Sequence, residues 1–139
     1  MVHPTREAFI NLAARGNLIP VYREILADVE TPVSAFLKID EPHATAFLLE
    51  SAESTERFGR YSFIGMDPSI VFESRDGKIR VTESGRTTKT ASDGDPLREL
   101  ETLMARFKPV TFEPLPIFWG GAVGFLSYEA ARFFESTVP

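Results

Sequence analysis

The hydrophobic and polar positions of this chain follow two periods, one of helices and one of strands. Three segments combine the helical period of about 3.6 residues with a capping residue or a proline at their start. They are residues 5–15, 31–40 and 95–107. The second helix is expected to bury Val33, Phe36 and Leu37, and the third Leu97, Leu100, Met104 and Phe107.

Strands are predicted where apolar, β-branched and aromatic residues gather between turn signals. The predicted strands are 18–27, 45–52, 60–65, 69–74, 78–83 and 118–127. Asp76-Gly77 is the strongest hairpin signal, and a two-residue turn there places Glu73 opposite Arg80. Residues 84–94 are the most polar and are expected to form a mobile loop, whereas 128–134 read as helical. The pattern predicts an α+β fold with mainly antiparallel sheet layers and a few flanking helices.

Composition narrows the class of protein. The chain has 139 residues, 43% of them hydrophobic and twelve of them Phe, which is enough for one domain with a core. The net charge of −5 argues against nucleic-acid binding, and the absence of cysteine excludes disulfides and thiol chemistry. No apolar run reaches the roughly 18 residues of a membrane span, so we expect a cytoplasmic protein with no membrane or nucleic-acid partner.

Candidate chemistry lies in residues 47–65. The apolar run Phe47-Leu-Leu ends in a carboxylate and a hydroxyl, Glu50 and Ser51, and Arg60 begins the next apolar run nine residues later. Two neighbouring strands would bring these three side chains together, where they could hold the ammonium and carboxylate of a free amino acid. A carboxylate at the end of a buried run needs a partner, so a structural ion pair between Glu50 and Arg60 explains the pattern equally well.

Catalytic motifs are not visible. Gly120-Gly-Ala-Val-Gly124 matches neither the dinucleotide fingerprint nor the P-loop, and a bent strand explains its glycines better. The two histidines have no metal-ligand spacing, and no catalytic triad can be assembled. The residues alone therefore predict a small polar pocket and no catalytic residue, metal site or cofactor in this chain.

Five segments together resemble the N-terminal region of anthranilate synthase component I. They are Gly16 to Asp28, Thr31 to Lys38, Phe47-Leu-Leu-Glu-Ser51, Gly59-Arg-Tyr-Ser-Phe-Ile-Gly65 and Gly120 to Glu129, in this order. The resemblance implies that residues 1–139 are a regulatory domain of a larger two-domain enzyme, an incomplete part that is inactive alone. The whole enzyme, a lyase, is expected to make anthranilate and pyruvate from chorismate and ammonia in tryptophan biosynthesis. Mg²⁺ and the catalytic residues would belong to a C-terminal chorismate-binding domain.

The resemblance also implies partners and site residues. A glutamine amidotransferase subunit (component II) would supply the ammonia, and L-tryptophan would bind as the feedback inhibitor. The family's Leu-Leu-Glu-Ser motif falls on residues 48–51, so Ser51 and Leu49 are expected to contact tryptophan and Glu50 to face its ammonium group. Arg60 stands where family members carry a basic residue that lines the pocket.

Three other hypotheses remain open. Aminodeoxychorismate synthase component I shares the Gly-Gly-x-Val-Gly segment at Gly120. A self-contained binding module would also lack catalytic groups, but it should be monomeric, whereas an open fragment should expose apolar surface within 118–134. A small hydrolase using Ser51 or Glu50 would need a general base that no motif positions.

Overall fold

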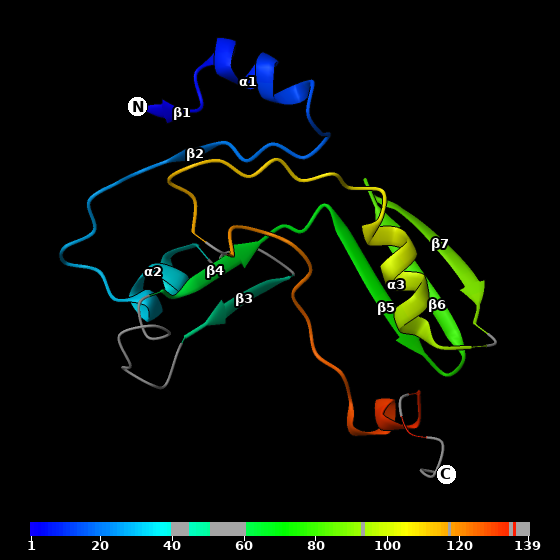
Figure 1. The fold of residues 1–139 in the computed structure, drawn as a ribbon. Coiled ribbons are helices and arrows are strands. Elements are labelled where there is room, and N and C mark those ends of the chain that lie inside the picture. Colours follow the sequence, from blue (N-terminus) through cyan, green and yellow to red (C-terminus); the bar gives the residue numbers. More distant parts are fainter. Residues whose placement is uncertain (40–44, 51–60, 93, 117, 134, 136–139) are drawn as a thin grey trace. The chain divides into compact units, whose positions relative to one another are not determined.

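The fold is described by a computed structural model for residues 1–39, 45–50, 61–92, 94–116, 118–133 and 135 (Figure 1). The helices are α1 (Arg6–Ala13), α2 (Pro32–Ile39), α3 (Pro96–Met104) and a 3₁₀ helix, η1 (Tyr128–Phe133). The strands are β1 (Val2–His3), β2 (Tyr22–Arg23), β3 (Ala46–Leu49), β4 (Phe63–Met66), β5 (Ile70–Arg75), β6 (Lys78–Glu83) and β7 (Arg86–Ala91). They form two antiparallel pairs, β1-β2 and β3-β4, and a three-stranded sheet in the order β5-β6-β7. The predicted α+β class is confirmed.

The chain divides into two compact units. One contains Met1–Glu24, Ser74–Lys78 and Ala91–Pro139, and the other contains Ile25–Glu73 and Ile79–Thr90. Val110 in the first unit and Ile79 in the second are the buried hydrophobic residues of the described part of the chain. The expected single core is therefore wrong for these residues, most of whose apolar side chains keep contact with solvent.

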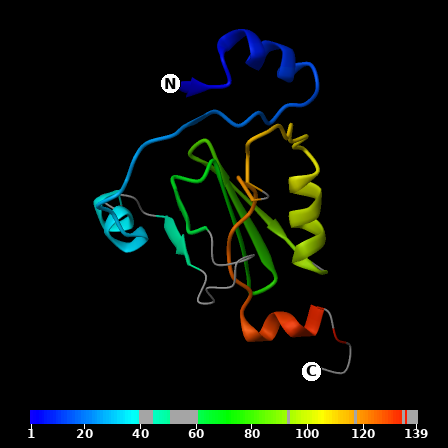
Figure 2. The ribbon, with the colours of Figure 1, turned by 60° about the vertical axis from the view of Figure 1, so that its left-hand side comes forward.

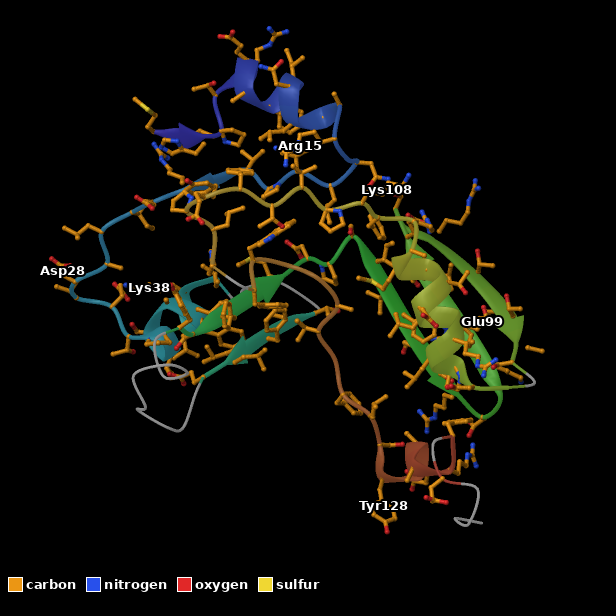
Figure 3. The ribbon with its side chains drawn as sticks, viewed as in Figure 1. Arg15, Asp28, Lys38, Glu99, Lys108 and Tyr128 are labelled. Carbon is orange, nitrogen blue, oxygen red and sulfur yellow. The ribbon has the colours of Figure 1, made fainter. Side chains whose placement is uncertain are left out.

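The first unit is held together where the chain after α1 meets the segment after α3 (Figure 1, Figure 2). The Asn17 side chain donates to the Arg106 carbonyl at 2.8 Å and accepts from the Lys108 amide at 2.6 Å. The Lys108 carbonyl accepts from the Asn17 amide at 3.1 Å, and the Val110 amide donates to the Leu18 carbonyl at 2.9 Å. Figure 3 labels Lys108 on this segment. These bonds join parts of the chain that lie about ninety residues apart.

Helix α1 begins and ends as its sequence predicts. Thr5 caps it, because its hydroxyl accepts from the Ala8 amide at 3.3 Å. The helix has ended before Gly16, whose α-carbon lies against the other segment. A Cβ placed on Gly16 would be 2.3 Å from the Lys108 carbonyl oxygen and 2.7 Å from a Val110 methyl group. Glycine is required here by space.

Helix α2 begins at Pro32, and the residues around its start hold one another. The Ser34 amide donates to the Thr31 hydroxyl at 3.1 Å, and the Thr31 amide donates to the Ser34 hydroxyl at 2.9 Å. Lys38 forms an ion pair with Glu30, and the Ser34 hydroxyl donates to Glu30 at 2.7 Å. These two hydrogen bonds, that from Lys38 above all, hold the pKa of Glu30 below its ordinary value.

Two faces differ from their predictions. Val33 and Leu37, expected to be buried on α2, are exposed, Leu37 at 66%. Phe36, the third residue expected on the buried side, is half-buried together with Ala35 and Ile39, and α2 contacts β3. In α3, Leu97 and Leu100 are half-buried as expected, but Met104 is exposed. Asp95 caps α3 by accepting from the Leu97 amide at 2.9 Å.

The predicted hairpin at Asp76-Gly77 is confirmed. Both turn residues have positive φ, 51° and 67°, as a type I′ turn requires. Arg80 and Glu73 lie opposite each other, with 3.5 Å between guanidinium nitrogen and carboxylate oxygen. The next segment was expected to be a loop, but it forms a second hairpin with β7, turning at Ser84-Gly85 with φ of 51° and 75°. The Thr82 and Thr87 hydroxyls, 2.9 Å apart, link its strands.

Two other predicted strands are largely wrong. Of residues 18–27, Tyr22–Arg23 form β2, paired with the unpredicted β1, and Leu18 makes an isolated bridge to Pro109. Pro20, which has no amide hydrogen to donate to a neighbouring strand, lies between Leu18 and β2. The described residues of 118–127 form no strand, and residues 120–128 are exposed, with Phe125 at 93% and Tyr128 at 91%. Figure 3 labels Tyr128 at the start of η1.

We predict that Gly16→Ala lowers the free energy of unfolding by about 2 kcal/mol, the usual cost of forcing a methyl group into occupied space. The obstacle is a backbone carbonyl at 2.3 Å, which cannot turn away as a side chain can. Urea unfolding of the chain measures the change. Gly94→Ala is the matched control, because no atom lies within 4 Å of a Cβ there. Equal stability of the two variants would contradict the close approach.

We also predict a pH-dependent effect of Glu30→Gln. Because the folded pKa of Glu30 is lowered, its carboxylate stabilises the fold above the ordinary glutamate pKa of 4.5, and this contribution is lost as the pH falls through the folded pKa. Glu30→Gln should therefore be less stable than the parent chain at pH 7 and equal to it well below pH 4.5. Unfolding in urea across this range tests the prediction. Glu24→Gln is the control, because Glu24 makes no hydrogen bond or ion pair with another described residue.

Candidate functional site

The predicted site residues belong to the β3-β4 hairpin. Antiparallel pairing sets Ala46 opposite Met66, Phe47 opposite Gly65, Leu48 opposite Ile64 and Leu49 opposite Phe63. Both faces of the hairpin are apolar, as in a strand pair that is covered on each side. Helix α2 contacts β3 within the same unit. Figure 1 shows β3 and β4 side by side and α2 next to them.

The structure places two of the four predicted residues. Leu49 is the last residue of β3 and is 45% exposed, and Glu50 follows it directly. Ser51 and Arg60 lie outside the described residues. The predicted meeting of Glu50, Ser51 and Arg60 therefore stays a prediction.

Glu50 differs from its expected surroundings. The sequence placed it at the end of a buried strand, but β3 ends at Leu49 and Glu50 is exposed. No hydrogen bond or ion pair joins Glu50 to another described residue. The reason is that a strand pair buries side chains only where both strands run, and Glu50 follows the last position that is paired.

An aromatic pair at the same end of the hairpin was missed by the sequence analysis. The Tyr61 and Phe63 rings are stacked, with centroids 6.1 Å apart and planes at 29°. Phe63 lies opposite Leu49, and Tyr61 is half exposed. The sequence does contain a pattern that could have predicted this pair. Tyr61 and Phe63 are two residues apart, a spacing that places both rings on one face of an extended chain.

The described end of the hairpin thus combines an aromatic pair, an aliphatic side chain and a carboxylate. Stacked rings and Leu49 suit a flat apolar group, and Glu50 suits a cation. Consecutive residues of an extended strand point to opposite faces, so the rings share the face of Leu49 rather than that of Glu50. These groups are suited to binding a ligand.

Two searches of the described residues complete the survey of sites. No group of three or more His, Asp and Glu residues there lies close enough to hold a metal ion. None of the helices in that part of the chain has both the length and the apolar character needed to cross a membrane.

Comparison with curated proteins gives relatives named anthranilate synthase component 1. The chain is 43% identical over 140 residues to anthranilate synthase component 1 of Synechocystis sp., and 40% identical over 124 residues to that of Aquifex aeolicus. It is 41% identical over 132 residues to that of Pseudomonas aeruginosa. The resemblance to anthranilate synthase component 1 is confirmed. The name does not favour aminodeoxychorismate synthase, the alternative that the glycine-rich segment left open.

The match covers this chain far better than it covers the relatives. It includes 100% of the chain with the Synechocystis protein, 89% with the Aquifex protein and 94% with the Pseudomonas protein. The chain spans only about a quarter of each relative's length: 27%, 25% and 26%. No family model and no solved structure matches the chain. The similarity therefore concerns one part of a much longer protein.

We predict that Glu50→Gln changes the free energy of unfolding by less than about 0.5 kcal/mol, as is usual for an exposed side chain, because Glu50 has no hydrogen bond or ion pair with another described residue. The same substitution at Glu30 removes a carboxylate that Lys38 and Ser34 hold, so it should cost more. Urea unfolding of both variants at pH 7 makes the comparison. A large loss for Glu50→Gln would show that this carboxylate has a structural partner after all.

Proposed function

We propose that this chain is the N-terminal, tryptophan-binding part of an anthranilate synthase component 1. The observation that carries the proposal is the similarity to proteins of this name along the whole chain, at 38–43% identity. The longer protein would convert chorismate and ammonia to anthranilate and pyruvate, as a lyase, with Mg²⁺ bound in its other domain. The present chain would contribute the effector site and no catalytic residue.

The exposed apolar side chains support a place within a larger protein. The described part of the chain buries two hydrophobic residues, whereas Phe125, Leu126 and Tyr128 are exposed. Apolar surface of this kind is typical of chains that pack against further protein. A self-contained binding module would be expected to cover these side chains itself, so this alternative is less well supported.

The end of the β3-β4 hairpin that carries Leu49, Glu50 and Phe63 supports the effector-binding role. Glu50 is available to face an ammonium group, and the stacked Tyr61 and Phe63 rings suit an indole. We propose that Ser51 and Arg60 complete the site, Ser51 through a hydrogen bond and Arg60 through the effector's carboxylate. Binding would lower chorismate turnover only if tryptophan prefers the less active of two arrangements of the whole protein.

The name of the relatives, component 1, implies a second component. We propose that this partner is a glutamine amidotransferase subunit that supplies ammonia, and that both work in the cytoplasm. Co-purification of the whole protein with such a subunit, followed by turnover with glutamine in place of ammonia, tests this part. The proposal would be contradicted if the whole protein used ammonia but never glutamine, even after the amidotransferase subunit was added.

We predict that Ser51→Phe in the whole protein abolishes inhibition by L-tryptophan, because a phenyl ring would fill the space of the effector and remove a hydroxyl that binds it. The measurement is the ratio of anthranilate formation rates with and without tryptophan, together with calorimetric titration of tryptophan. L-phenylalanine is the control ligand. Unchanged inhibition of the variant would contradict the role of Ser51. A parent protein that neither binds tryptophan nor is inhibited by it would refute the proposed effector function.

A further inference from the structure

Gly65 and Phe47 face each other across the β3-β4 hairpin at very short range. They are a register pair, and a Cβ placed on Gly65 would lie 2.2 Å from Cε1 and 2.5 Å from Cζ of Phe47. Cβ atoms in proteins do not come this close to carbon, so the outer edge of the Phe47 ring occupies the space that any other residue at position 65 would fill. The backbone of Gly65 does not have the positive φ that favours glycine. Space alone requires glycine here.

The Phe47 ring lies on the face that carries the proposed effector site. Residues two apart in a strand share a face, and paired residues of neighbouring strands share it too. Phe47 and Leu49 of β3 therefore lie on one face, with Phe63 opposite Leu49. Tyr61 stacks on Phe63 at 6.1 Å. The row of side chains on this face runs from the Phe47 ring over Gly65 to Leu49 and the aromatic pair of Phe63 and Tyr61.

We infer that Gly65 is a positioning residue for the effector site. By leaving room for the Phe47 ring, it determines the positions of the Leu49, Phe63 and Tyr61 side chains that contact the ligand. This inference rests on the proposed function. Gly65 itself touches no ligand in this account. A methyl group at position 65 would turn the ring toward its neighbour Leu49 or push β3 away from β4, and either movement displaces the walls of the site.

Other roles for Gly65 are weaker. Glycine in a strand normally costs stability, because it fixes a flexible residue and supplies no side chain. Here an aromatic ring from the neighbouring strand covers it, which is the arrangement known to offset that cost. If Gly65 had a purely structural role, Gly65→Ala would lower the stability of the protein without changing its inhibition by tryptophan. Measuring both properties separates the two roles.

The test is a double-mutant cycle in the whole protein, read as the tryptophan concentration that halves anthranilate formation. We expect Gly65→Ala to raise this concentration by about tenfold, within the usual range of coupling energies. In the background of Phe47→Leu, which lacks Cε1 and Cζ, Gly65→Ala should change it by less than about twofold. The uninhibited rate should stay within about twofold of the parent's in each variant. Gly94→Ala, with open space around its Cβ, is the matched control and should change nothing.

Each outcome decides the inference. An unchanged half-inhibitory concentration for Gly65→Ala, or an equal effect in both backgrounds, would overturn it. If Gly65→Ala does not fold, Phe47→Leu alone carries the test, because loss of the ring should raise the half-inhibitory concentration by about threefold, and an unchanged value would refute the inference. Failure of the proposed function is recognised separately, since the unsubstituted protein would then show no tryptophan inhibition at all.

Discussion

The hydrogen bonds between Asn17 and the backbone of residues 106–108 are the constraint on which the first unit depends. Asn17 uses its side-chain donor, its side-chain acceptor and its own amide on that single segment. These hydrogen bonds can form only because Gly16 has no side chain and lets the two backbones approach each other. Such distant segments meet at a considerable cost in chain entropy, which grows slowly with the length of the loop. A few directional bonds then fix which residues meet, and Val110, the buried hydrophobic residue of this unit, lies at the same place.

The second unit is organised differently. Its β3-β4 hairpin is apolar on both faces. The three-stranded sheet, most of which belongs to this unit, has two tight turns whose four residues all have positive φ, and the turn at Asp76-Gly77 belongs to the first unit. Local signals specify this sheet, because Asp76-Gly77 and Ser84-Gly85 determine the register of the strands they connect. The β3-β4 pair has no such turn among its described residues. The Phe47 ring fits against Gly65 in the observed register, and a slip of one residue would remove this fit by turning the side chains of one strand to the other face.

Apart from β7, the elements that local chemistry determines could be predicted, and those that distant partners determine could not. Thr5, Pro32 and Asp95 marked the three helix starts correctly, and Asp76-Gly77 marked the hairpin. The strand predicted in 118–127 is absent because apolar residues become a strand only beside another strand, and none accompanies it in the described chain. The strand β7 was missed because its segment is polar. Its threonines favour a strand, but its polarity suggested a loop. At the site, Leu49 and Glu50 were located correctly along the chain, whereas the exposure of Glu50 and the stacking of Tyr61 on Phe63 depend on where β3 and β4 end.

The position of the proposed effector site at the end of a hairpin has an energetic consequence. A ligand changes the balance between two arrangements of a protein only by the difference between its affinities for them. Side chains deep in a rigid core cannot supply such a difference in affinity, because their surroundings are the same in both arrangements. Leu49, Glu50 and Tyr61 are exposed where the paired strands end, so further protein can meet them in one arrangement and leave them in another. The Phe47 ring lies close over Gly65 in the paired part of the hairpin. A half-site that the strand pair holds in place would let the ligand's preference appear in the movement of its other half.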